Sequence, residues 1–269
     1  MNISTPPVVM LSGAGGGSPS FEPFRAGFAE GTTFEVIRYP SWRRYLETVF
    51  CFDALIDELS DQIRDRIPEG PIQIVGLSLG GHLGYVIAAK LQEYGRDISS
   101  FCAVDAFTVH STAPSAGWFK RTMVLCAGLL AKRNFAELAL VIRTRFWRAV
   151  LRLCQARLIN VIRMLEAYGL ADSLLKADPL LEGELNMRLL IQLTAPSLAI
   201  IDREPKILRT SAILLRTALT IDSDDSWRRR CPEIRICEIP GDHRTMLEAR
   251  NVSAISRVFS AAMRGPISA

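Results

Sequence analysis

Apolar and polar positions follow two different patterns in the first hundred residues of the chain. Short apolar runs, which we predict to be buried strands, cover residues 8–11, 34–39, 72–75 and 99–104. Between them, residues 48–66 and 79–94 carry apolar side chains at helical spacing. Strands that alternate with helices in this way are typical of β-α-β units, which build a parallel sheet.

The alternation stops near residue 112. Residues 112–209 are almost entirely helical in pattern, and strand-like runs return at 212–217 and 233–239, before a closing helix at 252–263. We therefore predict an α/β fold with a mostly parallel central sheet flanked by helices. The core is expected to comprise residues 1–111 and 206–269, with residues 112–205 inserted as a large helical lid.

Composition supports a folded, enzyme-sized protein. Hydrophobic residues make up 49% of the 269 positions and charged residues 22%, which excludes a disordered or fibrous chain. The net charge of +4 is too small to indicate nucleic-acid binding. The longest apolar run, residues 123–131, falls short of the roughly 20 residues that span a membrane. Because the first basic residue is Arg25, the start lacks the charged region of a secretory signal, and we expect a cytoplasmic protein without membrane insertion.

The cysteines and histidines do not form a metal-binding pattern. None of the six cysteines belongs to a C-x-x-C pair, and only three histidines could join them. We expect the cysteines to be reduced and mostly buried, and we predict no metal site. They are Cys51, Cys102, Cys126, Cys154, Cys231 and Cys237.

The most specific motif is Gly76-Leu77-Ser78-Leu79-Gly80, a G-x-S-x-G sequence between a predicted strand and a predicted helix. A serine at such a turn is held in a strained backbone conformation that exposes its hydroxyl, and the glycines let strand and helix approach closely. The helix also directs its positive dipole end toward the place where an oxyanion would form. We interpret Ser78 as a nucleophile; the alternative is a glycine-rich turn with a capping serine.

A serine nucleophile needs a base, and histidine is the natural one. His243 follows a predicted strand in a Pro-Gly-Asp-His turn near the carboxyl terminus, where the chain order nucleophile, acid, base would place it. His82 lies four residues after Ser78 on the helix and is predicted to pack under the turn. His110 lies in a loop with no strand end to hold it, so His243 is the favoured base.

The acid of the triad must orient the imidazole and stabilise its protonated form. Asp105 ends the strand that follows the nucleophile strand, and the carboxyl ends of parallel strands meet at one edge of the sheet. We favour Asp105 for this reason, with a capping role as its structural alternative. The rival acids follow the strand at 212–217 and are Asp222, Asp224 and Asp225.

Glycines crowd the loop after the first strand, at 13 and 15–17. A phosphate-binding loop is excluded, because no lysine precedes Lys90 and the G-x-G-x-x-G spacing fails. A loop in this position can instead supply a second oxyanion donor. We predict that the backbone N–H near Ala14 pairs with that of Leu79.

Basic residues are concentrated in the predicted insertion. Residues 112–170 hold ten of them against two acidic residues, a local net charge of +8. At about 100° per residue, one helical stripe would contain Arg145, Arg148, Arg152 and Arg163. Solvated faces normally mix both signs of charge, so this stripe indicates either an acidic partner or an anionic substrate arm, with a merely solvated face as the alternative.

Three segments together resemble the thioesterase domains of nonribosomal peptide and polyketide synthases, in the α/β-hydrolase superfamily. They are Gly76-Leu-Ser-Leu-Gly-Gly81, Val104-Asp105 and Pro240-Gly-Asp-His-Arg-Thr-Met-Leu247. The resemblance covers almost the whole chain and implies that Ser78 is acylated, Asp105 is the acid and His243 the base. It also implies an oxyanion hole at the N–H groups of Ala14 and Leu79, and a lid over the acyl chain. In stand-alone editing relatives the acid tends to lie one strand later, near Asp222.

The resemblance further implies a reaction and a partner. A thioesterase of this kind releases an acyl, peptidyl or polyketide chain from the phosphopantetheine arm of an acyl or peptidyl carrier protein, without a cofactor. The cationic lid, with Arg145, Arg148 and Arg152, would steer an acidic carrier toward the entrance. Two alternatives stay open: a carboxylic-ester hydrolase acting on free esters, and a catalytically silent carrier-docking module.

Overall fold

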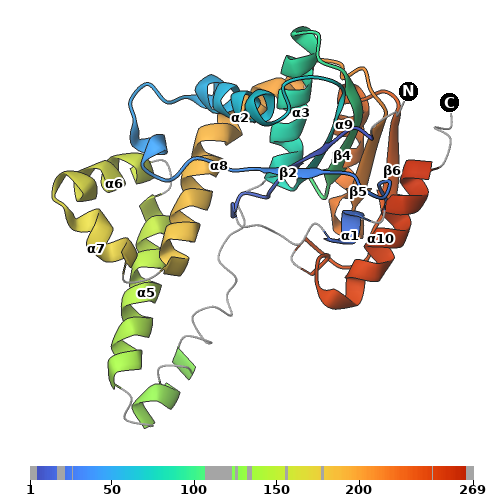
Figure 1. The fold of residues 1–269 in the computed structure, drawn as a ribbon. Helices are drawn as coiled ribbons and strands as arrows, with labels where there is room; N and C mark the ends of the chain where they lie inside the picture. The colour runs from blue at the N-terminus through green and yellow to red at the C-terminus, as the bar shows by residue number, and fades with distance from the viewer. Residues whose placement is uncertain are drawn as a thin grey trace. The chain divides into compact units, whose positions relative to one another are not determined.

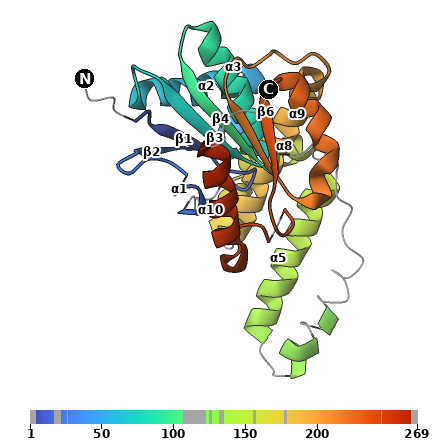
Figure 2. The same cartoon turned by 90° about the vertical axis from the view of Figure 1, so that its right-hand side faces the viewer.

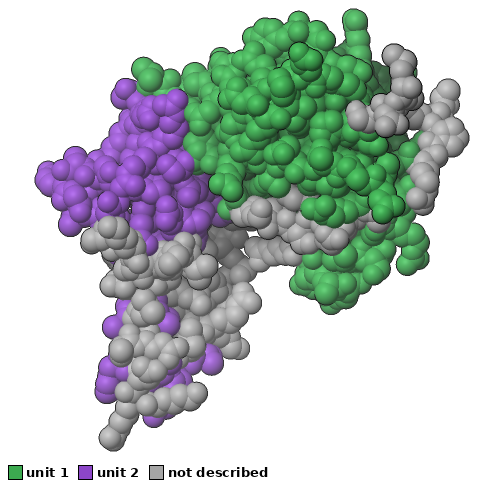
Figure 3. Space-filling view, in the orientation of Figure 1, with its two compact units in different colours: residues 1–40, 49–108, 193–269 green, residues 41–48, 109–192 purple. Residues whose placement is uncertain are grey.

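The computed structural model describes residues 5–16, 22–25, 27–106, 123–124, 127–131, 135–154, 157–176, 179–243 and 245–264. The chain divides into two compact units, coloured separately in Figure 3. Unit 1 comprises residues 1–40, 49–108 and 193–269, and unit 2 comprises residues 41–48 and 109–192. Each unit is described by itself.

Unit 1 is built on a six-stranded sheet in which every neighbouring pair is parallel (Figure 1). The strand order is β2-β1-β3-β4-β5-β6, the topology of a doubly wound sheet. Both β1 and β3 are buried along their whole length, which explains their uninterrupted apolar runs. The strands are β1 (Val8–Leu11), β2 (Phe34–Ile37), β3 (Ile72–Leu77), β4 (Ile98–Val104), β5 (Ala212–Arg216) and β6 (Ile234–Glu238).

Helices cover both faces of this sheet (Figure 2). α10 covers one face of the sheet. There the rings of Phe24 and Phe259 meet edge to face, with centroids 5.5 Å apart, and join Val8 and Met10 in the core. The other face carries α3, whose Gly84 lies against Leu11 and other side chains of the opposite pleat. The helices of unit 1 are α1 (Glu22–Arg25), α2 (Phe52–Arg66), α3 (Leu79–Glu93), α9 (Asp224–Arg230), α10 (Ala249–Arg264) and the 3₁₀ segment η3 (Ala218–Ser223).

The described part of unit 2 is mostly helical. It contains η1 (Arg44–Leu46), α5 (Phe135–Cys154), α6 (Leu158–Ala167), α7 (Leu170–Lys176) and the first part of α8 (Pro179–Arg203), which continues into unit 1. An apolar cluster joins these helices, and its residues are Leu151, Ile162, Leu165, Ala171, Leu175, Leu181 and Leu185.

Residues 41–48 belong to unit 2 although their neighbours on both sides belong to unit 1. Trp42 and Tyr45 are buried, each 2% exposed. Arg43 forms ion pairs with Glu166 of α6, at 3.1 Å, and with Asp172 of α7. Ion pairs therefore join this short stretch to helices more than a hundred residues away in sequence.

The predicted α/β class with its flanking helices is confirmed, and all six predicted strands are present. The prediction that Arg163 continues the basic stripe was wrong. The helical periodicity is broken, since α5 ends at Cys154 and α6 begins at Leu158, and Arg163 Nε donates to the carbonyl of Leu46 at 2.6 Å. Among the described residues, no helix has the length and apolar character that crossing a lipid bilayer requires.

Candidate active site

Ser78 stands at the sharp turn between β3 and α3. Its backbone has φ 54° and ψ −121°, a strained combination for a residue with a side chain. The turn is possible because the flanking glycines lack side chains: a Cβ on Gly76 would lie 2.2 Å from the carbonyl oxygen of Gly80. A Cβ on Gly80 would lie 2.3 Å from the carbonyl oxygen of Ser12. The strand, the helix and the loop after β1 therefore meet backbone to backbone around the serine.

Strand register brings Ser78 and Asp105 to the same edge of the sheet. Leu77 pairs with Val104 at the ends of β3 and β4, so the next residue on each strand leaves the sheet at the same level. The Ser78 N–H donates to the Val104 carbonyl at 2.7 Å, and the Asp105 N–H donates to the Leu215 carbonyl at 2.6 Å. Both residues thus remain tied to the sheet while their side chains point beyond it.

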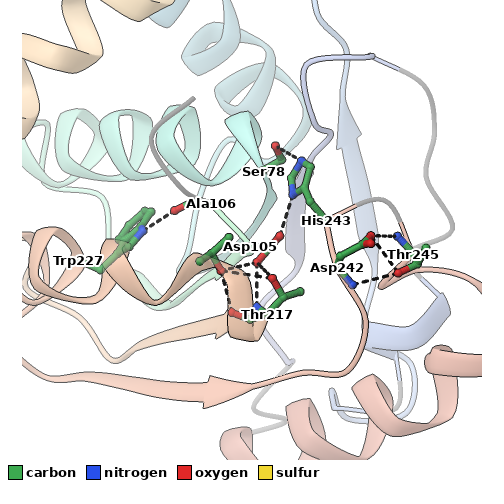
Figure 4. A network of polar contacts seen from close by, with 9 residues as sticks. Ser78, Asp105, Ala106, Thr217, Trp227, Asp242, His243 and Thr245 are labelled. Carbon is green, nitrogen blue, oxygen red and sulfur yellow. Dashed lines mark hydrogen bonds and ion pairs between the residues drawn. The ribbon is translucent and has the colours of Figure 1, made fainter. Parts of the chain in front are cut away.

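His243 connects these two side chains (Figure 4). Its Nε2 lies 3.1 Å from the Ser78 hydroxyl and its Nδ1 lies 2.8 Å from Asp105 Oδ2. The loop that carries it is closed by Asp242, whose carboxylate accepts the Thr245 N–H at 2.9 Å and the Thr245 hydroxyl at 3.0 Å. A histidine 165 residues after the serine is thereby brought to its hydroxyl.

Asp105 is fully buried, and both of its carboxylate oxygens take part in hydrogen bonds. Its Oδ1 accepts the Thr217 N–H at 2.9 Å, the Thr217 hydroxyl at 3.1 Å and the Thr220 hydroxyl at 2.7 Å. Burial by itself raises the pKa of the Asp105 carboxyl, but the hydrogen bonds from His243, Thr217 and Thr220 lower it by more, so that the pKa lies below its ordinary value. Asp105 is therefore a carboxylate at neutral pH, and it can only accept.

The carboxylate decides how the imidazole carries its proton. Because Asp105 can only accept a hydrogen bond, the Nδ1 of neutral His243 is the donor. Its Nε2 is then left with a lone pair directed at the Ser78 hydroxyl. This is the arrangement in which a histidine can remove the serine proton.

Thr217 and Thr220 were not among the residues singled out from the sequence. Thr217 directly follows β5, the strand next to β4, and Thr220 lies in η3. The place of Thr217 at an adjacent strand end was the one available signal, and hydroxyl residues at such positions are too common to be selected without coordinates.

Two of the rival acids have other surroundings than His243. Asp224 forms an ion pair with Arg216 at 2.9 Å, and Asp225 is exposed on α9. Asp222 lies in η3, and its side chain is outside the described residues. Among the candidate carboxylates whose side chains are described, Asp105 is the one that the structure joins to His243.

His82 has other partners than the residues of this hydrogen-bonded chain. His82 is 6% exposed, accepts a hydrogen bond from Arg230 at its Nδ1 (2.8 Å) and stacks on Trp227 with ring centroids 5.4 Å apart. Trp227 in turn donates from its indole nitrogen to the carbonyl of Ala106, the residue after Asp105, at 2.7 Å. His110 lies outside the described residues.

The predicted oxyanion donors belong to two segments that adjoin the serine. Leu79 is the first residue of α3, where helix N–H groups have no partner within the helix. Ala14 belongs to the loop after β1, and a Cβ on the adjacent Gly13 would lie 3.5 Å from the Ser78 Cβ. The loop backbone is thus next to the serine.

A family comparison agrees with this geometry. The family model for the thioesterase domain matches residues 6–263, nearly the full chain. The chain belongs to the thioesterase domain family. A comparison with curated protein sequences returns no match.

Solved structures with the same fold include several thioesterase domains. The Vlm2 thioesterase domain, in a structure bound with a dodecadepsipeptide, shares 18% identity with a TM-score of 0.57, over 95% of each chain. The NocB thioesterase domain, in covalent complex with a fluorophosphonate nocardicin G analog, shares 18% identity with a TM-score of 0.54, over 97% of this chain and 96% of that one. The four-domain nonribosomal peptide synthetase AB3403 shares 17% identity with a TM-score of 0.56, over 97% of this chain and 20% of that one.

In this thioesterase domain the residues predicted to steer a carrier, Arg145, Arg148 and Arg152, all lie on α5. Their side chains are outside the described residues, so their steering role stays a prediction from charge and sequence.

Proposed function

We propose that this protein is a chain-releasing thioesterase that cleaves an acyl, peptidyl or polyketide thioester through an acyl-enzyme on Ser78. The observation that carries the proposal is the continuous hydrogen-bonded chain from Ser78 Oγ through His243 to Asp105. In that chain each group has the position its chemical role requires: a nucleophile, a base whose Nε2 faces the nucleophile, and a buried carboxylate.

Acylation begins when Ser78 Oγ attacks the thioester carbonyl carbon and its proton passes to His243 Nε2. The carboxylate of Asp105 stabilises the resulting imidazolium without taking its proton. The negative charge moves to the carbonyl oxygen, where the N–H groups of Leu79 and Ala14 would hold it. The C–S bond then breaks, the imidazolium protonates the leaving thiolate, and the acyl group remains on Ser78 as an ester.

Release of the acyl group uses the same residues, with Ser78 Oγ as the leaving group. Water, or a nucleophile within the acyl chain, attacks the Ser78 ester while His243 removes its proton. The second tetrahedral intermediate collapses, and the proton returns to Ser78 Oγ. When water attacks, the product is a free acid. When a nucleophile within the acyl chain attacks, the product is a ring. None of these steps requires a cofactor.

We propose an acyl or peptidyl carrier protein with a phosphopantetheine arm as the partner that presents the thioester. Support comes from the family match and from neighbours whose descriptions name a depsipeptide-bound thioesterase domain and a four-domain synthetase. The cationic residues predicted on α5 are suited to an acidic carrier.

The test is the mass of the intact protein after incubation with acyl thioesters of phosphopantetheine and, separately, with aryl esters. We expect an acyl adduct that maps to Ser78 and is absent in Ser78→Ala, while the matched control Ser99→Ala, on an exposed residue of β4, is acylated like the wild type. Acylation by aryl esters alone would favour the free-ester hydrolase. A folded wild type that neither thioesters nor a fluorophosphonate probe modify would overturn the proposal in favour of a silent docking module.

A further inference from the structure

Tyr39 makes a hydrogen bond to the loop that lies beside the nucleophile. The phenol donates to the carbonyl oxygen of Ser12 at 2.5 Å, across 27 residues of sequence. Ser12 follows the last residue of β1, and Tyr39 lies two residues beyond the end of β2, the neighbouring strand. The bond therefore joins the ends of two adjacent strands at the edge of the sheet where the active site lies.

The Ser12 carbonyl is enclosed on a second side by the nucleophile helix. A Cβ on Gly80 would lie 2.3 Å from this oxygen, so the carbonyl lies almost on the helix backbone, and Ser12 is only 3% exposed. A carbonyl with so little access to water needs a protein donor. The Tyr39 hydroxyl is such a donor.

Two hydrogen bonds together determine the direction of the loop N–H groups. In a trans peptide the C=O and the following N–H point in opposite directions. The Tyr39 bond to the Ser12 carbonyl therefore sets the direction of the Gly13 N–H. The Gly16 N–H donates to the Gly13 carbonyl at 3.0 Å, which in the same way turns the Ala14 N–H away from the inside of this turn.

We propose that Tyr39 is a positioning residue for the oxyanion hole: its hydroxyl fixes the Ser12–Gly13 peptide, and together with the Gly16 bond to the Gly13 carbonyl this fixes the loop that carries the Ala14 N–H. This inference rests on the proposed function. Tyr39 itself does not touch the reacting atoms. Its contribution is realised in the tetrahedral intermediate, where the oxyanion needs a donor held in place, and not in binding of the substrate.

The distinguishing property is a kcat effect without a KM effect. An interaction that acts only in the transition state lowers kcat and kcat/KM equally when it is removed. In Tyr39→Phe we expect kcat for thioester cleavage to fall about three- to tenfold, the range of one neutral hydrogen bond, with KM unchanged. The rate constant for fluorophosphonate labelling of Ser78 should fall by a similar factor, because the phosphoryl oxygen occupies the same hole.

Tyr85→Phe is the matched control. The Tyr85 hydroxyl donates to the Lys206 carbonyl at the same distance, 2.5 Å, but Lys206 lies between α8 and β5 and not in the loop after β1. Removing this hydroxyl should lower the Tm and leave kcat and the labelling rate unchanged. A merely structural role for Tyr39 predicts that the two variants behave alike.

The outcomes separate the inference from the proposed function. A folded Tyr39→Phe protein with wild-type kcat and wild-type labelling rate overturns the inference and leaves the proposed function intact, as would equal kcat losses in both tyrosine variants. If the labelling rate falls but thioesters are not cleaved by the wild type, Tyr39 retains its role and the thioester substrate is wrong. A wild type with an unreactive Ser78 overturns both.

Discussion

Asp105 shows how much one residue of this site depends on distant parts of the chain. It has an unusual positive φ of 46°, and its carboxylate is held by His243, Thr217 and Thr220, all of which lie more than a hundred residues later. The position of Asp105 at a strand end could be predicted from the sequence, because strand ends are visible as the limits of apolar runs. Its two threonine partners could not, because hydroxyl residues beyond a strand end follow no apolar periodicity.

Replacing Asp105 with Asn should remove the charge that orients and stabilises the imidazolium. We expect Asp105→Asn to lower kcat by about 10³- to 10⁴-fold, as the loss of a triad carboxylate does in other serine hydrolases. Single-turnover acylation of Ser78 would measure the effect. Asp225→Asn, which changes an exposed carboxylate of α9, is the control and should keep wild-type turnover. The opposite pattern would assign the acid to the later position.

At the level of elements, apolar periodicity was sufficient to locate the strands but not all of their ends. The strand predicted over residues 34–39 stops at Ile37 in the structure. Beyond it, Gln62 of α2 binds the backbone of Arg38, accepting its N–H at 3.3 Å and donating to its carbonyl at 3.0 Å. The helix predicted from residue 48 begins at Phe52, after Cys51 in an extended conformation with φ −122° and ψ −179°. The contact at Arg38 is a tertiary one, which a local pattern does not contain.

The crowded junction of β3, α3 and the loop after β1 yields a prediction on packing. In Gly80→Ala the new methyl would overlap the Ser12 and Leu11 carbonyl oxygens, at 2.3 and 2.6 Å. We expect a loss of about 2 kcal/mol or more in the free energy of unfolding, measured in urea, and slower fluorophosphonate labelling.

The control for Gly80→Ala is a glycine in open space. Gly183 lies in α8 and a Cβ there would meet no atom within 4 Å. Gly183→Ala should stabilise the protein by about 0.4–1 kcal/mol, because alanine loses less backbone entropy in a helix. Equal stabilities for the two variants would contradict the close approach at Gly80.

Over the whole molecule, charge is distributed unevenly along the chain. The region 112–170 carries a net +8 in a protein whose total is +4, so the rest of the chain is net negative. Sequence alone could show this asymmetry, because formal charge is additive. It could not show how the charges group in space: Arg163 was expected beside the arginines of α5, but it lies on α6 and binds a backbone carbonyl.

If this charge steers an acidic carrier, cleavage of carrier-bound thioesters should weaken with salt. We expect kcat/KM to fall at least about threefold between roughly 0.05 and 0.5 M salt, as the Debye length shortens, while cleavage of a neutral aryl ester is unaffected. Replacing Arg145, Arg148 and Arg152 together by Gln should reduce this salt dependence.

The matched control removes three exposed arginines of unit 1, by changing Arg203, Arg228 and Arg257 to Gln. It alters the net charge by the same amount and should retain the salt dependence of the wild type. A carrier reaction indifferent to salt, or equal losses in the two triple variants, would argue against steering by α5.

Unit 2 is made of two separate stretches of chain, residues 41–48 and 109–192. An exchange of the helical region between homologous enzymes therefore has to transfer both stretches. A chimera that transplants residues 109–192 alone would separate Arg43 from Glu166 and Asp172, and the carbonyl of Leu46 from Arg163. The buried side chains of Trp42 and Tyr45 would then have to pack against residues from the other parent. Functional hybrids are accordingly expected when both stretches come from one parent, and insoluble ones when the parents are mixed.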